Sequence, residues 1–109
     1  VEVRRRLEAA GAQVRHAEGY PSWAPDFRSP LLARVRAAYE REFGSSPRVE
    51  VIHAGLECGV IGSKVAGMDM LSFGPTIRHP HSPSECVHLP SIERIWKLTT
   101  SLLADLARG

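Results

Sequence analysis

Histidine, cysteine and carboxylate side chains gather in the second half of the chain. Four of the five histidines lie between residues 53 and 88, a span that also holds both cysteines and three carboxylates. These are the usual zinc ligands in proteins, but no Cys-x2-Cys or His-x3–5-His pair occurs. On spacing alone, surface histidines in a proline-rich loop explain the pattern better than a metal site. A structural zinc module built from Cys58, Cys86 and two histidines is an alternative.

The loop around His81 favours an ordered site. Pro80 and Pro83 flank this histidine and restrict the backbone, which would fix the direction of its side chain. Glu85 follows four residues later, close enough to accept a hydrogen bond from the second ring nitrogen of a ligating histidine. These features raise the case for a metal ligand at His81 with Glu85 beside it, but on the residues alone the surface-histidine interpretation stays ahead.

A glycine-flanked turn at residues 53–59 (HAGLECG) forms the second candidate region. A strand followed by a glycine turn and a helix start would direct backbone N–H groups at an anion such as a carboxylate. A plain turn is the simpler interpretation. Cys58 could act as a nucleophile paired with His53 or His81, although a buried, inert thiol is favoured.

Periodicity and capping residues predict alternating helices and short strands. Ser29 followed by Pro30 is a strong helix start, and Gly44 supplies a stop. Helices are expected over residues 2–10, 29–44, from the glycine turn to about 67, and from 91 onward, with Trp96 in the core. Strands are expected over 12–18, 48–53 and 69–73, and an irregular loop over 74–89.

This order predicts an α/β fold in which helices pack on a small sheet. So few strands would leave an exposed sheet edge and an uncovered apolar face. The first residues are helical in pattern and contain no initiator Met. Both features lead us to expect that an N-terminal part of the protein precedes this chain.

Charge and hydropathy exclude several partner classes. The formal net charge of +2 is small and the Arg residues are dispersed among Glu, so neither nucleic acid nor a membrane surface is an expected partner. No apolar run reaches the roughly 18 residues of a membrane span, and no secretory signal opens the chain. A cytoplasmic location is the default expectation.

Four segments together resemble the aminoacyl-histidine dipeptidases (Xaa-His dipeptidases). These belong to the co-catalytic zinc peptidases that include aminoacylases and carnosinases. The resemblance runs through nearly the whole chain in matching order. The segments are 18–25 (EGYPSWAP), 53–59 (HAGLECG), 69–77 (DMLSFGPTI) and 81–85 (HSPSE).

The resemblance implies a C-terminal fragment of a catalytic α/β domain that a smaller α+β lid domain interrupts. Residues 1–19 would end the lid with its last helix and strand, 20–28 would be a linker, and 29–109 would belong to the catalytic domain. The family holds two zinc ions through five side chains, although other divalent metals can take their place.

The same resemblance implies roles for individual residues. His81 would be the one zinc ligand in this segment, with Glu85 as its supporting residue. Gly55, Glu57 and Gly59 match the loop beside the dipeptide substrate. The other ligands and the general base Glu would lie upstream, so no catalytic residue is expected here, and the isolated chain would be inactive.

The implied function is metal-dependent hydrolysis of Xaa-His dipeptides by the full-length protein, for which a homodimer is one option. Two other functions stay open. One is a non-catalytic α/β binding module that kept the scaffold. The other is a related zinc deacylase or carboxypeptidase.

Overall fold

The helix α2 (Pro30–Phe43) begins and ends where its sequence predicts. The Ser29 hydroxyl accepts a hydrogen bond from the Leu32 N–H at 2.9 Å, and Pro30 occupies the first turn. At the other end Gly44 adopts a left-handed conformation with φ of 67°, and its N–H bonds the Glu40 carbonyl. Local capping residues are therefore present at both boundaries, as the sequence predicts.

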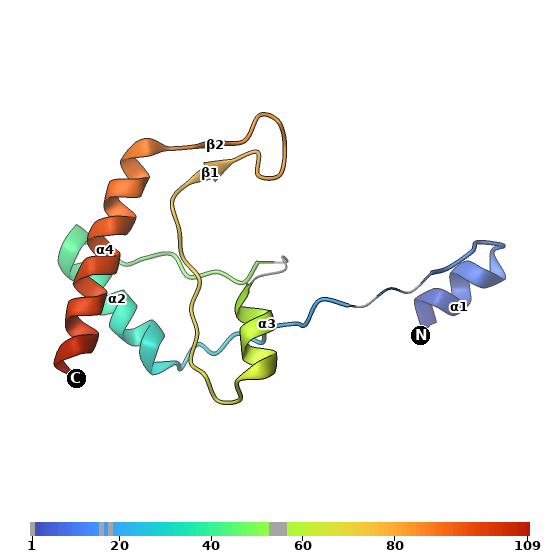
Figure 1. Cartoon of the computed structure of the whole chain (residues 1–109), viewed down its shortest axis with the longest axis horizontal. Coiled ribbons are helices and arrows are strands. Elements are labelled where there is room, and N and C mark those ends of the chain that lie inside the picture. The colour runs from blue at the N-terminus through green and yellow to red at the C-terminus, as the bar shows by residue number, and fades with distance from the viewer. Residues whose placement is uncertain (1, 16, 18, 53–56) are drawn as a thin grey trace.

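The computed structural model describes residues 2–15, 17, 19–52 and 57–109. Within these ranges it contains four helices and one two-stranded antiparallel sheet (Figure 1). The elements are α1 (Glu2–Ala9), α2, α3 (Glu57–Lys64), β1 (Ile77–Arg78), β2 (Cys86–Val87) and α4 (Leu89–Arg108). The predicted class, helices with a small sheet, is confirmed.

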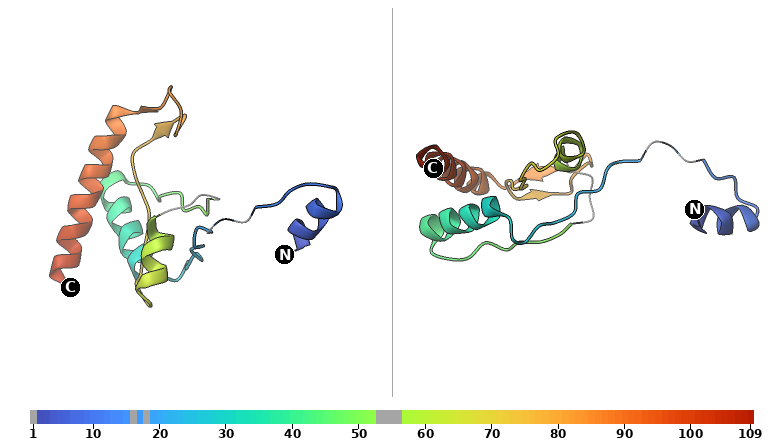
Figure 2. Two further views of the ribbon diagram at one scale, coloured as in Figure 1. Left: turned by 45° about the vertical axis from the view of Figure 1, so that its right-hand side comes forward. Right: turned by 90° about the horizontal axis from the view of Figure 1, so that it is seen from below.

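The core lies between α2 and α4, which run side by side (Figures 1 and 2). All of its buried apolar side chains come from these two helices: Leu32, Val35, Ala38, Leu98 and Leu102. These positions follow the helical period, so each helix turns one stripe toward the other. Burying these stripes is the main apolar contribution to packing in the described chain.

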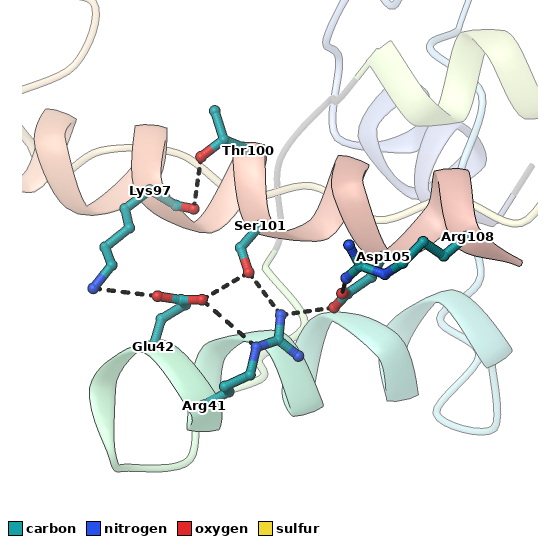
Figure 3. Close-up of polar contacts among 7 residues, drawn as sticks. All are labelled: Arg41, Glu42, Lys97, Thr100, Ser101, Asp105 and Arg108. Atoms are coloured by element: carbon teal, nitrogen blue, oxygen red, sulfur yellow. Dashed lines mark hydrogen bonds and ion pairs between the residues drawn. The ribbon is translucent and has the colours of Figure 1, made fainter.

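A row of polar contacts closes the outer side of the α2–α4 pair (Figure 3). The Arg41 guanidinium donates to the Ser101 hydroxyl at 2.6 Å and to the Asp105 carboxylate at 2.7 Å. Ser101 in turn donates to Glu42 at 2.8 Å, and Lys97 pairs with the same carboxylate at 3.2 Å. The Ser101 hydroxyl and Lys97 hold the pKa of Glu42 below its usual value. The row links Arg41 and Glu42 of α2 to residues 97–105 of α4.

Three expected strands do not form among the described residues. The segments 12–15, 48–52 and 69–73 are neither helical nor hydrogen-bonded as strands. A strand exists only when a neighbour pairs with its backbone, and no described segment does so for these three. Val51 and Ile52, which belong to the strand expected over 48–53, are 62% and 58% exposed.

Two further expectations need correction in the last third of the chain. The loop expected over 74–89 contains the β1–β2 hairpin, and α4 begins at Leu89, two residues earlier than expected. Trp96, expected in the core, is 69% exposed. It lies two positions from Leu98 and so falls on a different side of the helix from the stripe that meets α2.

The helix α1 lies apart from the other three helices in all views (Figures 1 and 2). Exposed side chains one turn apart form ion pairs within α1, such as Arg4–Glu8 at 2.8 Å and Arg6–Glu2 at 2.8 Å. The proposed division at residues 19 and 28 stays a prediction. In the described ranges, no helix combines the length and apolar character needed to cross a bilayer.

Candidate functional site

The segment that carries His81 is the loop of the β1–β2 hairpin. Ile77 pairs with Val87 and Arg78 with Cys86, so residues 79–85 form the connection. Two histidines of this loop have left-handed backbone conformations, His79 with φ of 53° and His81 with φ of 63°. Such values are uncommon outside glycine, and histidine is one of the residues that tolerates them. The turn therefore gives His81 a specific backbone direction.

Polar groups of the loop hydrogen-bond one another. Ser82 donates its hydroxyl to the His79 carbonyl at 2.8 Å and accepts the Ser84 N–H at 3.2 Å. The Ser82 carbonyl accepts the Glu85 N–H at 3.0 Å. A loop without regular structure is thereby ordered by its own side chains, as the two prolines led us to expect.

Glu85 contacts His81 through the backbone. Its carboxylate oxygen Oε2 accepts the His81 backbone N–H at 2.7 Å. The sequence led us to expect a bond to the imidazole ring instead. The four-residue spacing indicates that these two residues lie close together. Spacing alone cannot tell whether the backbone N–H or the ring N–H of His81 is the donor.

The hairpin is attached to the first turn of α4. The Ser91 hydroxyl accepts the Thr76 N–H at 2.9 Å and donates to the His88 carbonyl at 2.5 Å. The His88 N–H bonds the Thr76 carbonyl at 2.9 Å, which closes the base of the hairpin. The loop of His81 is therefore held by α4, which in turn packs on α2.

The predicted substrate loop is described only in part. Gly55 and His53 lie outside the described residues. Glu57 is the first residue of α3, and its side chain is exposed. Gly59 is buried against the linker, where a Cβ atom would lie 2.6 Å from the Pro21 carbonyl oxygen. Gly59 therefore lies where the linker leaves no room for a side chain, and its predicted contact with substrate stays a prediction.

Cys58 lies beside Gly59, at a hollow between α3 and the linker. The hollow has a volume of about 240 Å³ and is lined by side chains that include Trp23 and Met70. Cys58 is half-buried and Cys86 is exposed in β2, and both are free thiols. Cys58 therefore lines this hollow, and its predicted role as an inert thiol stays a prediction.

Metal-ligating side chains are dispersed in the part of the chain that the structure describes. There, no three His, Cys, Asp or Glu side chains lie close enough together to hold a metal ion. His81 is exposed at the tip of its hairpin and can offer one imidazole. That geometry suits a single ligand that joins donors from elsewhere. It gives no support to a structural zinc module that uses Cys58 and Cys86.

One structural pair was missed by sequence reasoning. Asp69, expected to start a strand, accepts the Ser29 hydroxyl at 2.6 Å and the Leu31 N–H at 3.0 Å. Both bonds hold the pKa of Asp69 below its usual value, and the bond from the Ser29 hydroxyl has the larger effect. The available signal was the capping serine, whose partner lies too far away in sequence to be inferred.

Known proteins match this chain along most of its length. No protein-family model matches it. The cytosol non-specific dipeptidase of Escherichia coli (strain K12) is 46% identical over 97 residues, which cover 89% of this chain. The crystal structure of aminoacylhistidine dipeptidase from Vibrio alginolyticus matches 95% of the chain with a TM-score of 0.75 and 42% identity. The resemblance to aminoacyl-histidine dipeptidases is confirmed.

The match covers only a part of each dipeptidase. The chain spans about one fifth of the length of both relatives, 20% of the first and 21% of the second. Four fifths of each dipeptidase therefore have no counterpart here.

Proposed function

We propose that this chain is part of a metal-dependent dipeptidase and that His81 is a metal ligand of its active site. The observation that supports this best is the ordered hairpin loop, which presents one exposed imidazole on a left-handed turn. The similarity to two dipeptidases supplies the reaction class. Hydrolysis of Xaa-His dipeptides is the finer proposal, supported by the name of the solved relative.

In this proposal, the residues of this chain orient a metal ligand and contact the substrate. His81 would offer a ring nitrogen to a zinc ion, and Glu85 holds the backbone from which the ring projects. Zinc in such sites polarises the scissile carbonyl and lowers the pKa of a bound water. Glu57, exposed at the start of α3, is the described side chain that we propose to contact substrate. A cytoplasmic location is proposed from the name of the Escherichia coli relative.

Substitution of His81 by alanine in the complete protein that contains this chain tests the proposal. Loss of a ligand should lower dipeptide hydrolysis at least about 100-fold, and zinc content measured by elemental analysis should fall. His88→Ala is the matched control, because His88 lies outside the loop at the start of α4. Unchanged turnover and zinc content in His81→Ala would reject the assignment.

A substrate panel separates the related activities. Xaa-His dipeptides, other dipeptides, N-acyl amino acids and longer peptides are compared at equal concentration by amino-acid release. A dipeptidase should cleave the dipeptides and leave the other two classes intact. Preference for N-acyl amino acids would indicate a deacylase, and no cleavage at all would favour a binding module.

A further inference from the structure

The backbone of His81 is in a conformation that its neighbours must maintain. Its φ of 63° lies in the left-handed region, which costs a non-glycine residue free energy relative to extended or right-handed backbone. Pro80 and Ser82 are adjacent in sequence, but neither donates to nor accepts from the His81 amide. The described contact that restrains this amide comes from Glu85.

The bond between the Glu85 carboxylate and the His81 N–H is a charge-assisted hydrogen bond. The distance from His81 N to Glu85 Oε2 is 2.7 Å, and hydrogen bonds to ionised acceptors are shorter and stronger than neutral ones. The Glu85 backbone is itself fixed by its N–H bond to the Ser82 carbonyl at 3.0 Å. Main chain and side chain of Glu85 together close a ring over residues 81–85.

A carboxylate that binds the amide acts differently from one that binds the imidazole. A bond to the ring would set the tautomer of the ligand and raise its basicity, and the negative charge of the carboxylate would strengthen the second effect. A bond to the amide sets only the backbone direction, and any oxygen in the same place can accept it. Glutamine has such an oxygen and no charge, so it separates the two cases.

We propose that Glu85 is a positioning residue, whose carboxylate holds the His81 amide in the left-handed turn that directs the imidazole. The link to metal binding rests on the proposed function, whereas the link to loop order does not. Glu85 therefore acts through the main chain of the ligand rather than through its ring.

The test compares Glu85→Ala and Glu85→Gln in the complete protein. Three properties are measured: zinc affinity by competition with a chelating dye, dipeptide hydrolysis, and hydrogen exchange of the peptide over residues 79–86 by mass spectrometry. Glu85→Ala should expose the His81 amide, speed its exchange and weaken zinc binding about tenfold or more. Glu85→Gln should keep exchange slow and restore zinc affinity and hydrolysis to within about threefold of the parent protein. Glu93→Ala, which removes an exposed carboxylate on α4, should match the parent.

Two results would overturn the proposal. In the first, Glu85→Ala leaves the exchange and the zinc affinity unchanged. In the second, Glu85→Gln keeps slow exchange but loses as much zinc affinity as Glu85→Ala, which would mean that the charge is needed. Failure of the dipeptidase proposal looks different: His81→Ala would then keep its zinc, while Glu85→Ala would still speed exchange at residue 81.

Discussion

The Ser29 hydroxyl lies 2.6 Å from Asp69 Oδ1, so an aspartate 40 positions away caps the same helix end as Ser29 itself. The second oxygen of Asp69 accepts the Leu31 N–H at 3.0 Å. A negative charge is favourable at a helix N-terminus, where backbone N–H groups lack partners. The pair therefore fastens the segment after α3 to the start of α2.

The Ser29–Asp69 pair should behave as one unit in stability measurements. Ser29→Ala should lower the free energy of unfolding by about 1 kcal/mol, and Asp69→Ala should change it in the same direction. The double variant should lose less than the sum of the two, because each removes the same bond. Denaturant unfolding of the four proteins measures this, and strict additivity would contradict the coupling.

The contribution of Asp69 should depend on pH. Its pKa is lowered in the folded chain by the Ser29 hydroxyl and then by the Leu31 N–H. Because the folded pKa is lower than the unfolded pKa, the ionised Asp69 carboxylate stabilises the folded chain fully at pH values above the unfolded pKa. This stabilisation is lost below about pH 4, as the pH falls through the folded pKa. The thermal midpoint of the parent should therefore fall toward that of Asp69→Asn on acidification. Asp26→Asn is the control, because among the described residues the Asp26 carboxylate bonds only the nearby Arg28 N–H. The Asp26 carbonyl, which accepts the Ser29 N–H at 3.3 Å, is kept in that variant.

Gly59→Ala should loosen the linker from α3. The added Cβ would lie 2.6 Å from the Pro21 carbonyl oxygen, which is backbone and cannot rotate away. Overpacking of this kind costs about 1–3 kcal/mol. Faster proteolytic cleavage within residues 20–28 would show the effect. Gly19→Ala should leave cleavage unchanged, since nothing lies within 4 Å of a Cβ at that position.

Ser91→Ala should detach the hairpin from α4 without unfolding the helices. The Thr76 N–H would lose its acceptor, at a local cost of about 1 kcal/mol. Hydrogen exchange at residue 76 should become faster, and Ser91→Thr should keep it slow because the hydroxyl is retained. Ser63→Ala is the matched control, as that hydroxyl bonds only the carbonyl of Val60 in its own helix.

Leu102→Ala should destabilise the pairing of α2 with α4. Leu102 is 6% exposed in the core, and truncation of such a leucine costs about 2–5 kcal/mol. Its neighbour Leu103 is 59% exposed, so Leu103→Ala should cost less than about 1 kcal/mol. Urea unfolding of the two variants measures the difference, and equal losses would contradict the assigned core.

Features that depend on local chemistry could be predicted from the sequence. The cap at Ser29 and the stop at Gly44 act within one turn of α2, and both were correct. His81 and Glu85 are in contact, but through the His81 backbone N–H and not through the ring nitrogen that the sequence led us to expect. The dipeptidase resemblance came from the order of short segments, which is again sequence information.

Features that depend on distant partners could not be predicted. The segments 48–52 and 69–73 have the β-branched and apolar character of strands, yet no described neighbour pairs with them. The Ser29–Asp69 bond joins positions whose proximity only the fold creates. The hairpin was missed because each strand has two residues, too few for an alternating pattern.

The distance in sequence between α2 and α4 has a consequence for how the chain folds. Arg41 and Ser101, in contact across the helix pair, are 60 positions apart, and α3 and the hairpin lie in the loop that this contact closes. Closing a long loop is slow, because its entropy is lost before the contacts that compensate for it are made. The hairpin and the first turn of α4 join neighbouring residues, so we expect this unit to form early. Docking of α2 on α4 would then be the slow step. The loop of His81 would therefore form before α4, to which it is attached, packs on α2.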